Sequence, residues 1–382
     1  MPPITWNQQV VKKNNKSLVL QMIIEQEPIS RADIAQVTGL NKATVSSMVN
    51  ELLEEELIYE SGPGESSGGR RPVQLHFNKV AGYSIGIDIG VNYILGVLTD
   101  LKGAILIEKN QPIDDSSYSV VIDQVKKMIY TIIDEMPNSR YGIIGIGIGV
   151  PGIVDKEGTV LLAPNLGWKD IPLKREIEDV FNLPVCIENE ANAGAYGEKQ
   201  FGANHHLQNF IYISAGIGIG VGIILNGELY RGKSGFSGEM GHMIIDVDGR
   251  QCSCGSQGCW EAYASEHALL KLTDNKNATL ESLIQAAEEN DENTLKLFEQ
   301  IGVYLGYGIN NIINTFNPEQ VMIGNRLAMA KKWLEQPIRK TIKTHTLSLH
   351  QSDLQLHFSK LSNYSSALGV SAFAVENFIK TE

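Results

Sequence analysis

Apolar residues near the start of the chain recur at helical spacing. Leu18, Val19, Met22 and Ile23 fall on one face of a helix, and the pattern stops at Pro28. Proline lacks the backbone N–H that a helix interior needs, so it is typical of a helix boundary. The pattern therefore predicts a first helix of about ten residues that ends before the proline.

Two further helices are predicted directly after this one. Ser30 and Asp33 have the spacing of a capping box, and Gly39 follows the short second helix as a left-handed C-cap would. Asn41 has the side chain of an N-cap for a third helix. The apolar residues of that helix fall at i, i+3, i+4 and i+7, which predicts its buried face: Val45, Met48, Val49 and Leu52.

The opposite face of the third helix carries small side chains that form hydrogen bonds. Such side chains allow a helix to lie deep in the major groove of DNA, so this is a candidate recognition helix. The candidate DNA-binding residues on the second and third helices and at their N-caps are Ser30, Arg31, Asn41, Lys42, Ala43, Thr44, Ser46, Ser47 and Asn50.

A glycine-rich loop between two alternating segments follows the helices. Residues 57–59 and 73–77 have the pattern of β-strands. Arg70 and Arg71 come at the end of the loop, where two guanidinium groups can enter a narrow minor groove of DNA. Three helices and such a wing favour a winged helix-turn-helix DNA-binding domain at 1–80, with a plain helical bundle carrying a solvated charge patch as the alternative.

Buried strands alternate with helices from residue 83 onward, which predicts an α/β fold. The strands are expected at 84–90, 93–99, 104–107, 143–150, 185–187, 210–214 and 219–225. The helices are expected near 120–135, 191–200, 263–272, 293–314 and 365–379.

Composition and charge are those of an ordinary water-soluble protein. The 382 residues exceed the usual size of one hydrophobic core, which predicts two or three domains. The chain has no membrane-spanning pattern and no signal-peptide pattern, so we expect a cytoplasmic protein without a membrane partner. A net charge of −12 is unfavourable for nonspecific DNA binding, but residues 1–80 hold eight basic and nine acidic residues and can still present a basic face.

Three of the four cysteines crowd into one short segment. Together with His242, the residues Cys252, Cys254 and Cys259 supply one imidazole and three thiolates, a set that suits tetrahedral zinc with no open position for water. Such a closed site is structural. The alternative is unligated cysteines, but three thiols so close together would be open to oxidation. Cys186 lies alone in an apolar run and is expected to pack in a core.

The chain after residue 83 resembles the ROK family, which has a two-lobed, actin-like sugar-kinase fold, and the N-terminal domain makes it similar to the repressors of that family. The similarity is carried by residues 30–49, 66–72, 81–90, 187–198, 229–243, 252–265 and 314–319. The resemblance implies a first α/β lobe at 81–195 completed by a C-terminal helix at 364–382, and a second lobe with the zinc motif at 196–363.

The resemblance also implies a sugar site beside the zinc motif. Glu239 and His242 match a Glu-x-Gly-His motif of the family, and Glu261 follows the last cysteine by two residues. Carboxylates suit sugars because one ionised group can accept two hydrogen bonds from hydroxyls. His242 would use one ring nitrogen for zinc and the other for sugar. The expected sugar-binding set is Asn165, Asn189, Glu190, Glu239, His242 and Glu261, with surface acids as the alternative for the two motif glutamates.

The phosphate-binding half departs from the kinases of the family. The kinases' Asp-x-Gly-Gly-Thr becomes Asp-Ile-Gly-Val-Asn from Asp88 onward, and the second glycine-rich loop has branched side chains at Ile217, Ile219 and Val221. Glu190 stands where the kinases have a catalytic aspartate, and its extra methylene would displace the carboxylate. We therefore expect no ATP, no catalytic residue and no enzyme activity, with an active sugar kinase as the less favoured alternative.

Taken together, the resemblance implies a sugar-responsive transcriptional repressor. Its expected partners are a palindromic double-stranded DNA operator, a small sugar effector and a second copy of the chain, in a homodimer or a dimer of dimers. The expected effector is D-xylose, acting on xylose-utilisation genes and releasing the operator, and a regulator of another sugar's genes is the alternative. Glu190 suits a pentose, because it could fill the space that the hydroxymethyl group of glucose would need.

Overall fold

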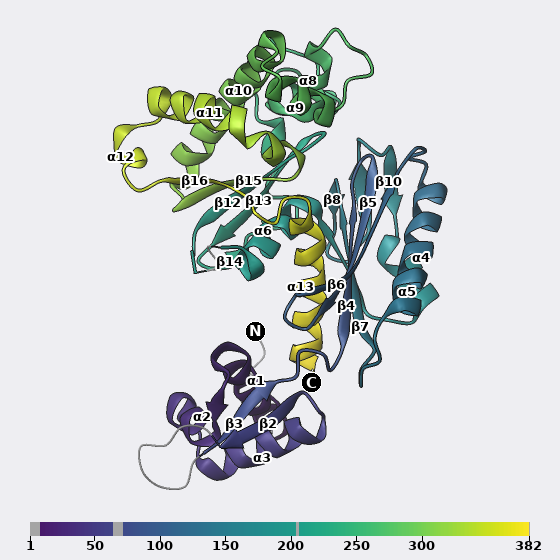
Figure 1. The fold of residues 1–382 in the computed structure, drawn as a ribbon, viewed down its shortest axis with the longest axis vertical. Coiled ribbons are helices and arrows are strands. Elements are labelled where there is room, and N and C mark those ends of the chain that lie inside the picture. The colour runs from purple at the N-terminus through teal and green to yellow at the C-terminus, as the bar shows by residue number, and fades with distance from the viewer. Residues whose placement is uncertain (1–7, 64–71, 204–205, 382) are drawn as a thin grey trace.

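The chain folds into an N-terminal module, two large β-sheets flanked by helices, and a long C-terminal helix (Figure 1). The computed structural model describes residues 8–63, 72–203 and 206–381. Strands and helices alternate after residue 83, so the predicted α/β class is confirmed. None of the described helices is long and apolar enough to span a membrane.

Three helices and a three-stranded antiparallel sheet form the N-terminal module, defined here as residues 8–63 and 72–81. The sheet has the order β1-β3-β2, and Ile58 pairs with Phe77 at the base of the wing. This is the predicted winged helix-turn-helix arrangement. The elements are α1 (Gln8–Gln26), β1 (Ile29–Ser30), α2 (Arg31–Thr38), α3 (Lys42–Glu54), β2 (Ile58–Pro63) and β3 (Val73–Phe77).

Local sequence signals set the limits of α2 and α3. Ser30 and Asp33 form the predicted capping box, in which the Ser30 hydroxyl accepts a hydrogen bond from the backbone N–H of Asp33. Gly39 ends α2 with a φ of 70°, which glycine adopts without a steric penalty. Asn41 caps α3 through the N–H of Thr44. The predicted stripe of α3 is buried in the module core: Val45, Met48, Val49 and Leu52.

The first helix is longer than its apolar pattern indicates. α1 has 19 residues, whereas the pattern predicts about ten, so that expectation is wrong. The additional N-terminal turns are mostly exposed and have no apolar stripe, which is why periodicity misses them. Two ion pairs hold these turns on α3, Lys12 with Glu51 and Lys16 with Glu55.

The first large sheet has the strand order β11-β7-β4-β5-β6. β7 pairs in parallel with β4 and β11, whereas β5 pairs antiparallel with β4 and β6. α4 and α5 cover one face, and a small sheet of order β10-β9-β8 extends the same core. The elements are β4 (Tyr83–Ile89), β5 (Tyr93–Asp100), β6 (Ile105–Pro112), α4 (Tyr118–Glu135), β7 (Ile143–Val150), β8 (Ile153–Val154), β9 (Val160–Ala163), β10 (Trp168–Ile171), α5 (Leu173–Phe181) and β11 (Val185–Asn189).

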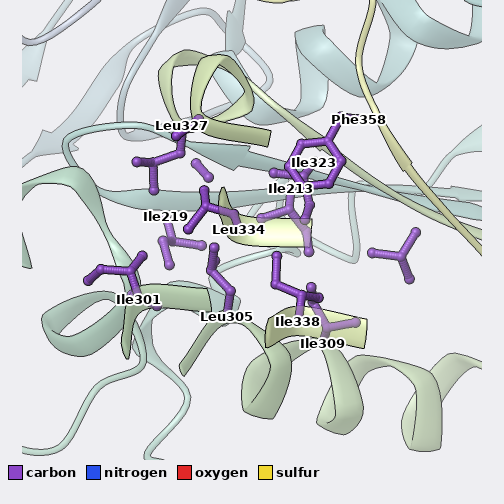
Figure 2. Close-up of a cluster of buried hydrophobic side chains, with 14 of the residues drawn as sticks. Ile213, Ile219, Ile301, Leu305, Ile309, Ile323, Leu327, Leu334, Ile338 and Phe358 are labelled. Carbon is purple, nitrogen blue, oxygen red and sulfur yellow. The ribbon is translucent and has the colours of Figure 1, made fainter. Parts of the chain in front are cut away.

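The second large sheet has the strand order β14-β13-β12-β15-β16. Figure 2 shows Ile213 and Ile323 of this sheet packed with Leu305 and Ile338 of the covering helices α10 and α11. The elements are β12 (Phe210–Ala215), β13 (Ile219–Leu225), β14 (Glu228–Leu229), η1 (Met240–His242), α7 (Glu261–Ala264), α8 (Glu266–Leu272), α9 (Leu280–Glu288), α10 (Glu292–Phe316), β15 (Gln320–Gly324), η2 (Arg326–Ala330), α11 (Lys331–His345), α12 (Ser348–Gln351) and β16 (Gln355–Phe358).

One predicted helix beside the second sheet is two helices. The expectation of a single helix at 263–272 is wrong, because Ser265 has extended backbone angles and separates α7 from α8. Its side chain accepts a hydrogen bond from the N–H of Ala268, so Ser265 is the N-cap of α8. Among the elements of this half, the sequence patterns also miss α9, α11, β15 and β16.

Two helices, α6 (Glu190–Phe201) and α13 (Tyr364–Thr381), lie between the two large sheets. α6 packs on the second sheet, where a Cβ on Gly222 would lie 2.3 Å from the backbone oxygen of Ala191. α13 packs equally closely on the first sheet (Figure 1). The predicted boundary between residues 195 and 196 falls inside α6. The two halves of the molecule are therefore defined here by the two large sheets.

Candidate functional site

One pocket brings together all the residues that the sequence predicts as sugar-binding. Its walls come from loops and helix ends that belong to both large sheets. The predicted residues among its lining are Asn165, Asn189, Glu190, Glu239, His242 and Glu261. Their position in one pocket agrees with the expectation, and their role in binding stays a prediction.

Short helices and a glycine place the polar side chains of the pocket. Glu239 is the N-cap residue of η1, and Glu261 is the first residue of α7. A Cβ on Gly218 would lie 3.0 Å from Oε2 of Glu261 and 3.3 Å from Nδ2 of Asn165, so a larger residue would fill the space beside both. Burial, and to a smaller extent Glu261, raises the pKa of Glu239 above its usual value.

Asn189 fixes the start of α6 at the edge of the pocket. Its Oδ1 accepts hydrogen bonds from the N–H groups of Ala191 and Asn192 at 2.9 and 3.1 Å. Its Nδ2 donates to the carbonyl oxygen of Gly152 at 2.9 Å. An amide nitrogen carries two hydrogens, so one donor of Asn189 remains for a ligand.

Four potential metal ligands meet beside the pocket. The ligand atoms of His242, Cys252, Cys254 and Cys259 all lie within 4.8 Å of one another. The Sγ atoms of Cys254 and Cys259 are 3.7 Å apart, and Sγ of Cys252 is 3.7 Å from Nδ1 of His242. Tetrahedral zinc with bonds of about 2.3 Å to sulfur and about 2.0 Å to nitrogen requires ligand separations of roughly 3.5–3.8 Å. The residues present therefore fit a closed zinc site.

His242 links the metal ligands to the pocket. Its Nδ1 faces Cys252, whereas its Nε2 lies 4.0 Å from Oε2 of Glu239. Nδ1 also lies 3.7 Å from Oε1 of Glu261, so it faces both a predicted metal ligand and a predicted sugar-binding residue, whereas Nε2 lies on the side of Glu239. An isolated β-bridge between Gln251 and Gln257 closes the loop that carries the cysteines.

Two carboxyl groups are buried where the two sheets meet. Asp88, which is 1% exposed, accepts hydrogen bonds from Ser366 at 2.7 Å and from the Tyr93 hydroxyl at 2.6 Å. Glu190 accepts one from Ser214 at 2.7 Å. Burial raises the pKa of Asp88 to about 6, and burial together with the charge of Asp88 raises that of Glu190 to about 7.

Tyr93 is a pocket residue that the sequence reasoning misses. A Cβ on Gly90 would lie 2.3 Å from Cε1 of the Tyr93 ring, so the ring covers the loop after β4. Its hydroxyl is bonded to Asp88, the acid that the resemblance to kinases singles out. Tyr93 begins an ordinary apolar strand, and nothing in the local sequence marks it as a partner of Asp88.

The three branched residues of the second glycine-rich segment all line the pocket, together with Val91. Ile217 lies in the loop before β13, whereas Ile219 and Val221 belong to β13 and are also buried in the core of the second sheet. Their effect on phosphate binding stays a prediction.

The predicted recognition face of α3 lies on the surface of the module. Lys42, Ala43, Ser47 and Asn50 are exposed. Thr44 and Ser46, which belong to the same predicted set, are half-buried. Arg70 and Arg71, the predicted wing residues, lie outside the described residues.

Two of the predicted DNA-binding residues have partners within the module. Ser30 is 2% exposed, and its hydroxyl donates a hydrogen bond to Asp33, so it positions α2 rather than offering a side chain to DNA. Arg31 donates to Oδ1 of Asn50 at 3.0 Å and to Glu60 at 2.9 Å. Arg31 and Asn50 therefore form one polar group at the edge of the recognition face.

Comparisons with known proteins cover both parts of the chain. The ROK family profile matches residues 84–377, and the MarR family profile matches residues 13–71. A protein of Bacillus spizizenii described as a xylose repressor is 49% identical over 375 residues, which is 98% of each chain.

Solved structures give the same picture. A ROK family transcriptional regulator, described as a homolog of the E. coli MLC protein, has a TM-score of 0.82 and 29% identity over 97% of both chains. A ROK family glucokinase from Streptomyces griseus, solved with glucose and AMPPNP, has a TM-score of 0.71 and 29% identity, and covers 77% of this chain and 100% of its own. The chain therefore belongs to the ROK family, in which it joins the fold shared with the kinases to an N-terminal winged helix-turn-helix module.

Proposed function

We propose that this protein is a transcriptional repressor of xylose-utilisation genes that binds a palindromic operator and releases it when D-xylose occupies the pocket. The observation that carries the proposal is that one chain contains both a winged helix-turn-helix module and a pocket with four acidic or imidazole side chains beside a cluster of potential metal ligands. The similarity to the xylose repressor of Bacillus spizizenii supports the choice of sugar.

In this proposal α3 enters the major groove and the wing reaches the minor groove. Lys42 at the start of α3 contacts a phosphate, while Ala43, Ser47 and Asn50 meet base edges. Arg70 and Arg71 extend into the minor groove. Two copies of the chain present two such helices to the half-sites of a palindrome, as dimeric helix-turn-helix proteins do.

The sugar is held by hydrogen bonds from its hydroxyl groups to the acidic side chains of the pocket. Glu239 and Glu261 accept from neighbouring hydroxyls, and His242 orients between them because its Nδ1 side faces the cysteines. Asn165, which lies beside Glu261 at Gly218, and Asn189 donate hydrogen bonds to the sugar. Glu190 closes the end of the pocket and leaves space for a pentose rather than a hexose.

A structural zinc ion would be held by His242, Cys252, Cys254 and Cys259. When bound, it would supply a fixed tetrahedral centre that orders the cysteine loop and the ring of His242. The separations of the ligand atoms and the absence of a place for a water ligand in a four-residue set support this assignment.

We propose that the protein senses sugar without phosphorylating it. A kinase needs a free acid and an open phosphate-binding loop, whereas Asp88 is bonded to Tyr93 and the Tyr93 ring covers Gly90. A sugar kinase is the second candidate, because the similar glucokinase structure was solved with glucose and AMPPNP. Release of ADP from ATP in the presence of D-xylose or glucose would favour that candidate.

The test is a gel shift of an operator fragment titrated with D-xylose, glucose and other pentoses and hexoses. We expect D-xylose to weaken the complex most. The Glu261→Ala variant should keep operator affinity and lose the response to D-xylose, whereas Glu299→Ala, an exposed residue of α10 away from the pocket, should behave like the native protein. A native complex that D-xylose leaves unchanged, or that glucose dissociates more readily, would contradict the proposed effector.

A further inference from the structure

The first turn of α13 touches the polar groups behind the pocket. Ser366 donates a hydrogen bond to Asp88 at 2.7 Å, and Asp88 also accepts one from Tyr93, which lines the pocket. Ser365 donates to Glu198 of α6 at 2.7 Å. A ligand that moves Tyr93 or the start of α6 would therefore move partners of α13.

The middle of α13 has no freedom to bend independently of its neighbours. Cβ atoms added at Gly86 and Gly147 of the first sheet would lie 2.0 and 2.1 Å from backbone oxygens of α13, and one at Gly197 of α6 would lie 2.1 Å from another. These glycines bring the backbones into direct contact. Such close packing transmits a displacement through the helix because packed interiors deform little.

The last turns of α13 belong to the hydrophobic core of the N-terminal module. Ala374 and Val375 are buried in the same cluster as Val45 and Val49 of α3, and Phe378 packs against it. In Figure 1 the C-terminus lies beside the module. The N-terminal module is therefore not joined to the rest of the molecule by a linker alone, because the end of α13 is part of its hydrophobic core.

Polar contacts fix the same interface around the apolar centre. Arg140 pairs with Glu56 at 2.7 Å, and the Tyr141 hydroxyl donates to the carbonyl oxygen of Glu55 at 3.1 Å. The Tyr141 ring also packs edge-on against Phe378, with centroids 5.1 Å apart. Both glutamates directly follow α3, so the end of the recognition helix is tied to the first half of the molecule.

We propose that α13 is the element that couples the pocket to the DNA-binding module, with Ser366 as its positioning residue at the pocket end and Val375 and Phe378 as its docking residues at the module end. A helix of this length spans about 27 Å at roughly 1.5 Å per residue, and its two ends contact Asp88 behind the pocket and the core of the module. Ligand binding changes the Asp88–Ser366 contact, α13 shifts as a rigid body, and the module follows because its core includes the end of the helix. The identity of the ligand rests on the proposed function.

The first test needs no ligand. Native-state hydrogen exchange of the full chain should show amides of α3 and of the last turns of α13 opening with the same free energy, because Ala374 and Val375 are buried in the core of the N-terminal module. In Phe378→Ala and Val375→Ala, α3 should open separately and more readily. The matched control is Lys380→Ala, which removes only an exposed ion pair of the same helix and should leave exchange unchanged. Independent opening of α3 in the native protein would overturn the proposal.

The second test measures coupling with D-xylose as the probe. For a coupled system, D-xylose should change the operator Kd of the native protein by about 5- to 150-fold. We expect this ratio to fall below about threefold in Ser366→Ala and in Phe378→Ala. Calorimetry should show that both variants still bind D-xylose. The control Lys380→Ala should keep the native ratio. A full native ratio in both α13 variants would overturn the role of α13. If D-xylose does not bind the native protein, the proposed effector fails, and the exchange experiment still decides the role of α13.

Discussion

At the scale of single residues, the carboxyl groups of Asp88 and Glu190 contribute to the response of the molecule to pH. Asp88 is 1% exposed and Glu190 is half-buried at the pocket, and desolvation disfavours the charged form of a carboxyl. Hydrogen bonds from Tyr93, Ser366 and Ser214 lower the pKa values, but less than burial raises them. The folded chain therefore holds these two protons more tightly than the unfolded chain does.

This difference predicts a loss of stability with rising pH. Because the pKa values are raised from 3.8 to about 6 and from 4.5 to about 7, the stabilisation is complete below about pH 4 and is lost as pH rises through 6 and 7. Between about pH 5 and 8 the free energy of unfolding of the native protein should decrease. In the Asp88→Asn variant this decrease should be smaller by on the order of 1 kcal/mol. Urea denaturation at the two pH values measures this.

A suitable control for the pH experiment is Glu335→Gln. Partial burial raises the pKa of Glu335, but the hydrogen bond with Arg339 and the charges of Lys331 and Arg339 together lower it further, so the net shift is downward. Its titration therefore lies below the tested range, and the native pH dependence should persist. Equal slopes for Asp88→Asn and the native protein would contradict a buried protonated pair.

At the scale of elements, the N-terminal module contains serines with two different roles, one that stabilises a helix end and one that is exposed on the surface. Ser30 caps α2 and is buried, whereas Ser47 is exposed on α3. Ser30→Ala should lower the free energy of unfolding by about 1 kcal/mol through the lost cap. Ser47→Ala should change stability by less than about 0.5 kcal/mol and should weaken operator binding about fivefold, or ~1 kcal/mol. Urea denaturation measures the stability of both variants, and gel shifts measure their operator affinity. Loss of stability in Ser47→Ala, or loss of operator affinity alone in Ser30→Ala, would contradict the prediction.

The cysteine loop brings together the four potential ligands of the proposed zinc site. Cys254→Ser should lower the zinc content to well below one ion per chain and destabilise the second half of the molecule by on the order of 3 kcal/mol or more. Cys186→Ala is the matched control, because Cys186 lies apart from the metal cluster. Metal analysis and thermal unfolding, with and without a chelator, provide the measurements. A full zinc content in Cys254→Ser would exclude this residue as a ligand.

The elements that sequence patterns predict are those whose signals are local. The caps at Ser30 and Asn41 and the apolar stripe of α3 depend on residues within one or two turns, so they can be read directly. α1 is longer than predicted because ion pairs with α3 stabilise its polar turns. α11 has an apolar stripe at Leu334, Ile338 and Ile342, but the sequence also contains Pro337, which is typical of a helix boundary and here packs at Gly302 of α10.

The same distinction applies to the pocket. Six of its polar residues are predictable because family motifs mark them, and the four potential metal ligands because their chemistry does. The contact of Ser366 with Asp88 and the position of the end of α13 in the module core depend on tertiary packing between segments hundreds of residues apart. Propensity and periodicity carry no information about such contacts.

At the scale of the whole molecule, binding by two modules predicts how operator affinity depends on salt. The net charge of −12 makes nonspecific attraction weak, so individual phosphate contacts should dominate the dependence. Removing the exposed Lys42 from each chain should reduce the slope of log K against log salt by about 0.9 per phosphate contact, hence about 1.8 for a dimer on a palindrome. Lys276→Ala, in an exposed turn far along the chain, is the control. The operator affinity is measured at several salt concentrations. The slope would decrease by only about 0.9 if one module binds, and would not decrease if Lys42 does not face the DNA.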